Sequence, residues 1–240
     1  MPSRSPHRPT TSSPTQNGLA SPRLRRVAHQ RFEADSRLPA TEQEERCELC
    51  SAPLAADHRH LVDLRSRQLV CTCRACSLLF DRRAAGGGHY RLVPDRRLRL
   101  ADFALEDAVW EQLRIPVEMA FFFYSSAAAR VVAFYPSPMG ATESRLELAA
   151  WKEIARANPL LGTLEPDVEA LLVNRAGARP GHWLVPIDDC YRLVAVIRTR
   201  WRGFSGGKEV WTELERFFAD LDRSAREQRQ HETQTGLQTS

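Results

Sequence analysis

Two Cys-x-x-Cys pairs limit what this chain can fold into more than any other feature of its sequence. Cys47 and Cys50 form the first pair, and Cys73 and Cys76 form the second after 22 intervening residues. A turn of this kind brings two sulfur atoms within about 2.3 Å of one metal ion, and zinc prefers four such ligands in a tetrahedron. We therefore expect the two turns to share one structural zinc ion that holds a small module together.

The segment between the two pairs predicts a β-hairpin. The apolar runs 61–64 and 68–70 are short and closely spaced, so they would carry the second pair back to the first, as in a zinc ribbon. Cys71 is a fifth thiol two residues before Cys73, and alternate residues of a strand share a face. Cys71 is thus available as a substitute ligand, and His58 and His60 could compete for a position.

The same cysteines leave two iron sites open as alternatives. A closed shell of four thiolates has no position for water, so it indicates a structural centre rather than a hydrolytic one. Iron in a rubredoxin-like site would make the chain an electron carrier, but Ser51 and Ser77 stand where such sites usually have glycine. An iron-sulfur cluster that uses Cys71 is the remaining metal alternative.

From residue 100 onward, longer periodic segments predict a mixed α+β domain with a mainly antiparallel sheet. β-Branched and aromatic runs predict strands, and apolar residues three and four apart predict helices. The expected strands are 117–124, 130–135, 168–174, 183–186 and 191–199; the expected helices are 105–113, 146–157 and one from Gly207; and 136–140 is expected to be a loop.

Composition divides the chain into four parts. Residues 1–43 lack hydrophobic periodicity and predict a disordered arm, and the polar residues 226–240 predict a disordered tail. Residues 44–99 form the zinc-ribbon-like module, and residues 100–225 form the α+β domain. The predicted fold class is therefore α+β, with a small metal module in front.

Sequence patterns also favour a cytoplasmic protein without a membrane span. No apolar run approaches the roughly 20 residues that cross a bilayer. The first 20 residues are rich in proline, serine and threonine, and they contain no apolar segment typical of a secretory signal. Thiols stay reduced in the cytoplasm, which favours clustered cysteines as metal ligands over disulfides.

The positive charge gives only weak support for nucleic-acid binding. The formal net charge is +4, and the basic excess lies mostly in the metal module. Its arginine-rich stretch contains Arg91, Arg96, Arg97 and Arg99, with no aromatic residue interleaved beyond Tyr90 to stack on bases. We expect a solvated face there, and a nucleic-acid-binding zinc ribbon remains an alternative function.

Candidate catalytic motifs are incomplete. The segment 203–207 fits the Gly-x-Ser-x-Gly nucleophile pattern, but too little chain follows it to supply the acid and histidine of a hydrolase. Cys190 immediately precedes an expected strand, where a buried structural cysteine is the commoner outcome. The sequence therefore favours a non-enzymatic role. The start of the last helix offers a candidate anion-binding site formed by Ser205, Gly206, Gly207 and Lys208.

Three motifs together resemble an uncharacterised actinobacterial family whose genes often lie beside those of a nickel-iron hydrogenase. They are Cys-Glu-Leu-Cys-Ser-Ala-Pro-Leu at 47–54, Phe-Tyr-Pro-Ser-Pro-Met-Gly-Ala-Thr-Glu-Ser at 134–144 and Trp-Arg-Gly-Phe-Ser-Gly-Gly at 201–207. The resemblance covers about residues 44–222. It implies an accessory role in assembling or serving a hydrogenase, with a hydrogenase subunit or maturation factor as the protein partner. It supplies no catalytic residues.

Overall fold

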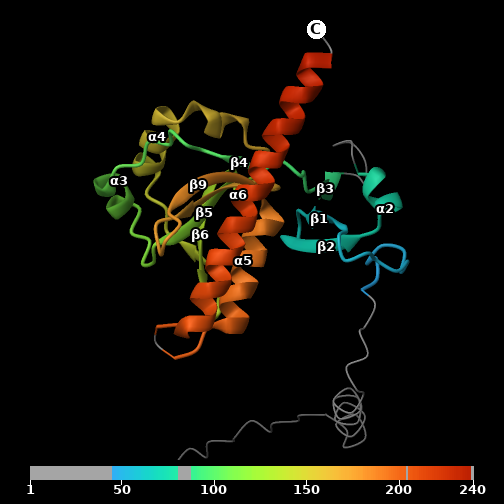
Figure 1. Cartoon of the computed structure of the whole chain (residues 1–240), viewed down its shortest axis with the longest axis horizontal. Helices are drawn as coiled ribbons and strands as arrows, with labels where there is room; N and C mark the ends of the chain where they lie inside the picture. The colour runs from blue at the N-terminus through green and yellow to red at the C-terminus, as the bar shows by residue number, and fades with distance from the viewer. Residues whose placement is uncertain (1–44, 81–87, 204, 239–240) are drawn as a thin grey trace, which may run out of the picture. The chain divides into compact units, whose positions relative to one another are not determined.

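The computed structural model describes residues 45–80, 88–203 and 205–238, with Leu148 and residues 229–238 described by their backbone alone. These residues form two antiparallel sheets and their covering helices (Figure 1). The predicted α+β class is therefore confirmed. The predicted N-terminal arm lies outside the described residues.

The smaller sheet, called the ribbon sheet below, contains the hairpin that the sequence predicts. Strand β1 (Arg59–Asp63) pairs with β2 (Gln68–Thr72) on one side and with β3 (Tyr90–Leu92) on the other, all antiparallel. The short helix α2 (Arg74–Leu78) follows β2 directly. This order places the second cysteine pair at the end of the hairpin.

The larger sheet has six strands in the order β4-β9-β8-β5-β6-β7, and every neighbouring pair is antiparallel. A mainly antiparallel sheet was the expectation, and it is confirmed. The strands are β4 (Leu98–Arg99), β5 (Met119–Ser125), β6 (Arg130–Ser137), β7 (Gly140–Ser144), β8 (Glu169–Asn174) and β9 (Gly181–Pro186).

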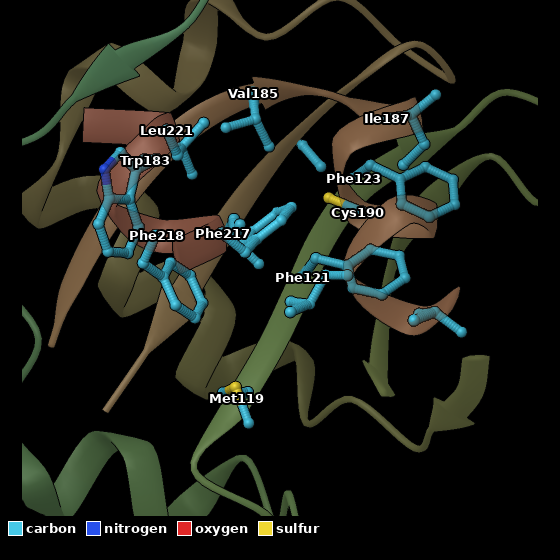
Figure 2. Close-up of a cluster of buried hydrophobic side chains, with 14 of the residues drawn as sticks. Met119, Phe121, Phe123, Trp183, Val185, Ile187, Cys190, Phe217, Phe218 and Leu221 are labelled. Atoms are coloured by element: carbon cyan, nitrogen blue, oxygen red, sulfur yellow. The ribbon is translucent and has the colours of Figure 1, made fainter. Parts of the chain in front are cut away.

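Helices cover both faces of this sheet, because its central strands are apolar on both sides. In β5, Phe121 and Phe123 pack with α5 (Ile187–Arg200) and α6 (Gly207–Gln238) (Figure 2). Ala120 and Phe122 pack with α3 (Asp107–Gln112) and α4 (Leu148–Ala157), the helices on the other face of the sheet (Figure 1). The alternation follows from the period of two along a strand. The helices are α3 (Asp107–Gln112), α4 (Leu148–Ala157), the 3₁₀ helix η2 (Pro159–Thr163), α5 (Ile187–Arg200) and α6 (Gly207–Gln238).

Two expected elements were wrong. Residues 191–199 belong to helix α5 and not to a strand: the buried positions Cys190, Leu193, Val194 and Ile197 recur at helical spacing, so burial overrode β-branched composition. Of the expected loop 136–140, only residues 138–139 form a turn, because Pro136 and Ser137 end β6 and Gly140 begins β7.

Proline is tolerated in β6 because of its place in the sheet. Pro136 pairs with Ala141 of β7, but it lies past the last residue of β6 that pairs with β5. Its missing N–H therefore leaves no ladder bond to β5 unmade.

The arginine-rich stretch is not the solvated face that the sequence predicts. Arg96 holds Glu169 through two bonds, Nε to Oε1 at 2.8 Å and Nη2 to Oε2 at 2.7 Å. Arg97 Nε lies 2.6 Å from Asp189 Oδ2. Both carboxylates are buried, so each arginine provides the charge that makes burial tolerable.

The two outer arginines of this stretch behave in the same way. Arg99 Nη1 lies 2.6 Å from Asp222 Oδ1, which also accepts a bond from the Trp183 indole N–H. Arg91 Nη1 lies 3.5 Å from Asp167 Oδ2. We call these four residues, Arg91, Arg96, Arg97 and Arg99, the arginine strap, because they tie the link between the two sheets to β8, α5, α6 and the turn before β8.

The described residues, which begin at Glu45, belong to one compact unit. Within it, Val62 of the ribbon sheet packs in the same apolar cluster as Phe123 and Ile187. Helix α6 continues to Gln238, and it therefore includes most of residues 226–240, for which the sequence predicts a disordered tail. Among the described residues, no helix is both long enough and apolar enough to cross a bilayer.

We expect Glu169→Gln to lower the free energy of unfolding by about 2–4 kcal/mol, because it leaves the Arg96 charge without a buried partner. The side chain of Glu169 is only 2% exposed. The matched control is Glu143→Gln, which breaks the surface pair with Arg130 and should cost less than about 1 kcal/mol. Urea denaturation at neutral pH measures both, and equal losses would contradict the buried-pair assignment.

We predict that the folded chain loses stability in mild acid because of His182. Burial, together with Arg175 and Arg99, lowers the pKa of His182 from 6.5 to about 4. The folded state thus favours the neutral ring, so this contribution is complete above pH 6.5 and is lost as the pH falls toward 4. For this partly exposed ring we expect about 1–2 kcal/mol.

The measurement compares the wild-type chain with His182→Gln in urea at several pH values. The stability difference between the two chains should change through the interval from pH 6.5 to 4. Parallel curves over that interval would show that His182 does not link folding to protonation.

Candidate metal centre

The first cysteine pair lies in a tight turn. Ser51 N–H donates to the carbonyl of Cys47 at 2.7 Å, and Cys47 N–H donates to the carbonyl of Ala52 at 2.8 Å. Ser51 has a φ of +61°, the left-handed conformation that lets the chain reverse here. Cys47 is 1% exposed and Cys50 is exposed, so one sulfur of this turn faces the interior and the other lies at the rim.

The second cysteine pair begins a helix. Cys73 is the N-cap of α2, and its sulfur accepts a bond from the N–H of Cys76 at 3.4 Å. A side chain that accepts from the first turn satisfies one of the free N–H groups of a helix start. The local sequence therefore fixes both sulfurs on the side of α2 that begins the helix.

Glu48 links the two turns. Its N–H donates to the carbonyl of Cys71 at 2.9 Å, and its carboxylate accepts from the N–H of Cys71 at 2.5 Å. Cys71 is the penultimate residue of β2, so this double contact fastens the first turn to the strand that leads into the second. The hairpin thus brings together cysteines that are distant in sequence.

The four cysteines of the two pairs meet as the sequence predicts. Their sulfur atoms all lie within 4.8 Å of one another. The sulfurs of Cys50 and Cys73 are 3.7 Å apart. Four thiolates around zinc at 2.3 Å would be about 3.8 Å apart, so this edge has the length of a tetrahedral site. The four cysteine sulfurs therefore fit a metal ion coordinated by four thiolates.

The crowded thiols have unequal acidities. Burial opposes ionisation of Cys47, but backbone bonds from Cys73, Leu49 and Cys50 lower its pKa to about 6. The Cys50 side chain and, after it, burial and the other thiols raise the pKa of Cys76 to about 12. One thiolate forms readily and further ones repel it, so the cluster needs a cation to ionise fully.

Cys71 belongs to a different group. The structure places its ligand atom within 4.8 Å of those of His58 and His60, and not with the four cysteines. Burial raises the pKa of Cys71, and the carboxylates of Glu48 and Glu45 raise it further. Sequence reasoning treated these three residues as competitors for one centre. The His-x-His pattern next to a strand was the signal that could have separated them.

The candidate anion site lies where α6 begins. Gly206 is buried against Val210 and Trp201, while Ser205, Gly207 and Lys208 are exposed. Gly206 has a φ of +86°, and a Cβ there would lie 2.8 Å from Val210, so the turn requires glycine. Anion binding at this turn stays a prediction.

Cys190 lies in α5 within the apolar cluster of Figure 2. Burial raises its pKa well above 9, and Asp189 and Asp188 add to the effect. A thiol in this environment stays protonated and behaves as a small apolar side chain.

One family model matches this chain, over residues 46–225, and its description is "Family of unknown function (DUF5947)". No curated protein and no solved structure matches. The match covers well over half of the sequence, and it agrees with the resemblance to an uncharacterised family. The chain therefore belongs to DUF5947, a protein family of unknown function.

Proposed function

We propose that the four-cysteine centre holds a structural zinc ion and that the chain is a non-enzymatic, metal-binding accessory protein. The single observation that carries the proposal is the convergence of four sulfurs from two turns within 4.8 Å. A closed thiolate shell stabilises a fold and leaves no position for a substrate. All six cysteines are free thiols, which suits a reducing compartment such as the cytoplasm.

The finer part of the proposal is a role in the assembly or function of a nickel-iron hydrogenase. Its support is the resemblance carried by the motifs at 47–54, 134–144 and 201–207. The third motif includes Trp201, and the second forms most of the β6–β7 hairpin. We propose a hydrogenase subunit or a maturation factor as the partner.

An electron carrier is the second candidate, and one observation favours it. Cys50 is exposed at the rim of the cluster, so an iron ion held there would lie close to a docked redox partner. Metal analysis distinguishes the two functions by identifying the ion. The visible spectrum is a second test, because an iron-loaded chain absorbs visible light and a zinc-loaded chain does not.

Cys50→Ser should remove the zinc ion of this centre. Metal content measured after purification without a metal-affinity resin should fall by about one zinc per chain, because three thiolates hold zinc less tightly than four. Hydrogen exchange should then rise in residues 45–80, since the two turns lose their common ligand.

Cys190→Ala is the matched control, because it removes a buried thiol outside the centre. It should keep the metal content of the wild-type chain. Equal zinc content in Cys50→Ser and the wild-type chain would disprove the four-thiolate assignment, and iron in stoichiometric amount would favour the electron carrier.

The hydrogenase role predicts a named partner. A tagged chain expressed in a hydrogen-oxidising cell that carries its gene should co-purify a nickel-iron hydrogenase subunit or a maturation factor, identified by mass spectrometry. Deletion of the gene should lower hydrogenase activity in the same cell. Unchanged activity together with no hydrogenase protein in the eluate would contradict this role and leave the zinc assignment intact.

A further inference from the structure

A second set of metal-ligand side chains lies on the ribbon sheet and shares no residue with the four-cysteine centre. His58, His60 and Cys71 each offer one ligand atom, and these atoms lie within 4.8 Å of one another. Cys71 is the register partner of His60 across β1 and β2, so their side chains share a face. His58 precedes His60 by two positions, the spacing that keeps side chains on one face of an extended chain.

His58 carries a buried nitrogen without a partner. Its Nδ1 lies 3.0 Å from the carbonyl oxygen of Ala55 and 3.6 Å from Oε2 of Glu45. Both neighbours are acceptors, so Nδ1 carries the ring proton and Nε2 presents a lone pair. The side chain is only 9% exposed, and Nε2 has no hydrogen-bond partner. A buried lone pair of this kind is costly unless an incoming donor or a metal ion satisfies it.

His60 is oriented in the same sense by helix α5. Its Nδ1 lies 3.0 Å from Oδ2 of Asp188, which belongs to the first turn of α5. A metal-ligating histidine usually donates its other ring N–H to a carboxylate or a backbone carbonyl, which fixes the tautomer and the ring orientation. His58 and His60 each have one of these two partners, so both rings present Nε2 as the free ligand atom.

We propose that His58 Nε2, His60 Nε2 and Cys71 Sγ bind a second metal ion, of the zinc or copper(I) class, with a fourth coordination position left open. Two imidazoles and one thiolate suit both ions. Three protein ligands and one open position are the pattern of sites that hold a water molecule or accept a donor from a ligand. The His60 side chain is 25% exposed, so the site is reachable from solvent.

The test uses the full chain, loaded with Zn²⁺, and maps which cysteines react with iodoacetamide by mass spectrometry. The wild-type chain should bind about two zinc ions, and Cys71 should be protected only after zinc is added. In His60→Asn the zinc content should fall to about one ion per chain. Cys71 should then react with iodoacetamide, while the four cysteines of the four-cysteine centre stay protected. Cys71→Ser should show the same loss of one ion.

His89→Gln is the matched control, because His89 is an exposed histidine that lies outside this group. It should keep both ions. One zinc per wild-type chain, with Cys71 equally reactive with and without zinc, would overturn the proposal unless copper(I) added without oxygen protects Cys71. Reaction of Cys47, Cys50, Cys73 and Cys76 in the presence of zinc would instead overturn the four-cysteine centre.

Asp188→Asn tests the positioning role of the carboxylate. The amide keeps the size of the side chain, its oxygen can still accept the bond from the N–H of Asp189, and the loss of charge weakens the bond to His60. Zinc affinity at the second site should fall by about 10-fold or more, with the four-cysteine centre unchanged. Equal affinity in the variant and the wild-type chain would show that Asp188 does not orient a ligand.

Discussion

The pairing of the arginine strap with buried carboxylates is the constraint on which the arrangement of the rest depends. Glu169, Asp189 and Asp222 lie in or beside the core of the larger sheet, where an uncompensated charge would be expelled. The strap supplies the compensating charges from a segment of only nine residues, 91–99. Because Arg91 belongs to β3 and Arg99 to β4, the strap fixes both ends of the connection between the two sheets.

This arrangement gives the ribbon sheet a support that its own few apolar residues could not provide. Leu61 is buried in it, and Val62 packs in the core cluster shared with α5 and the larger sheet. Small modules with little core usually need a metal or a disulfide. Here the thiolate centre holds one end of the ribbon, and the strap and the shared cluster hold the other. A metal ion bound at this centre would therefore organise the two turns more than it would stabilise the whole chain.

Much of the fold follows from local pattern. The Cys-x-x-Cys spacing predicted the convergence of two turns because zinc chemistry specifies both the number of ligands and their separation. Strands β5, β6, β8 and β9 were predictable from apolar runs, and α4 and the start of α6 from helical spacing. Helix α5 was mistaken for a strand because Val194, Val196 and Ile197 have high strand propensity, and only tertiary burial shows which face they need.

The parts that sequence could not supply are those that join distant segments. The partners of Arg96 and Arg97 lie more than 70 residues away, and no local spacing connects them. The same holds for His60 and Asp188, which are 128 positions apart. Composition indicated that the strap was basic, but it could not show that each guanidinium faces inward to a carboxylate.

Glu48 joins the four-cysteine group to the group of His58, His60 and Cys71. It stands between Cys47 and Cys50 in sequence, and it binds both main-chain polar groups of Cys71. A shift in the first turn would therefore be passed to Cys71, a member of the neighbouring histidine group, through the two bonds of Glu48. Thermodynamic linkage is reciprocal, so any gain in affinity that filling one centre gives the other must be returned in equal measure. A positive coupling between two such centres would make the response to metal supply steeper than that of two isolated sites.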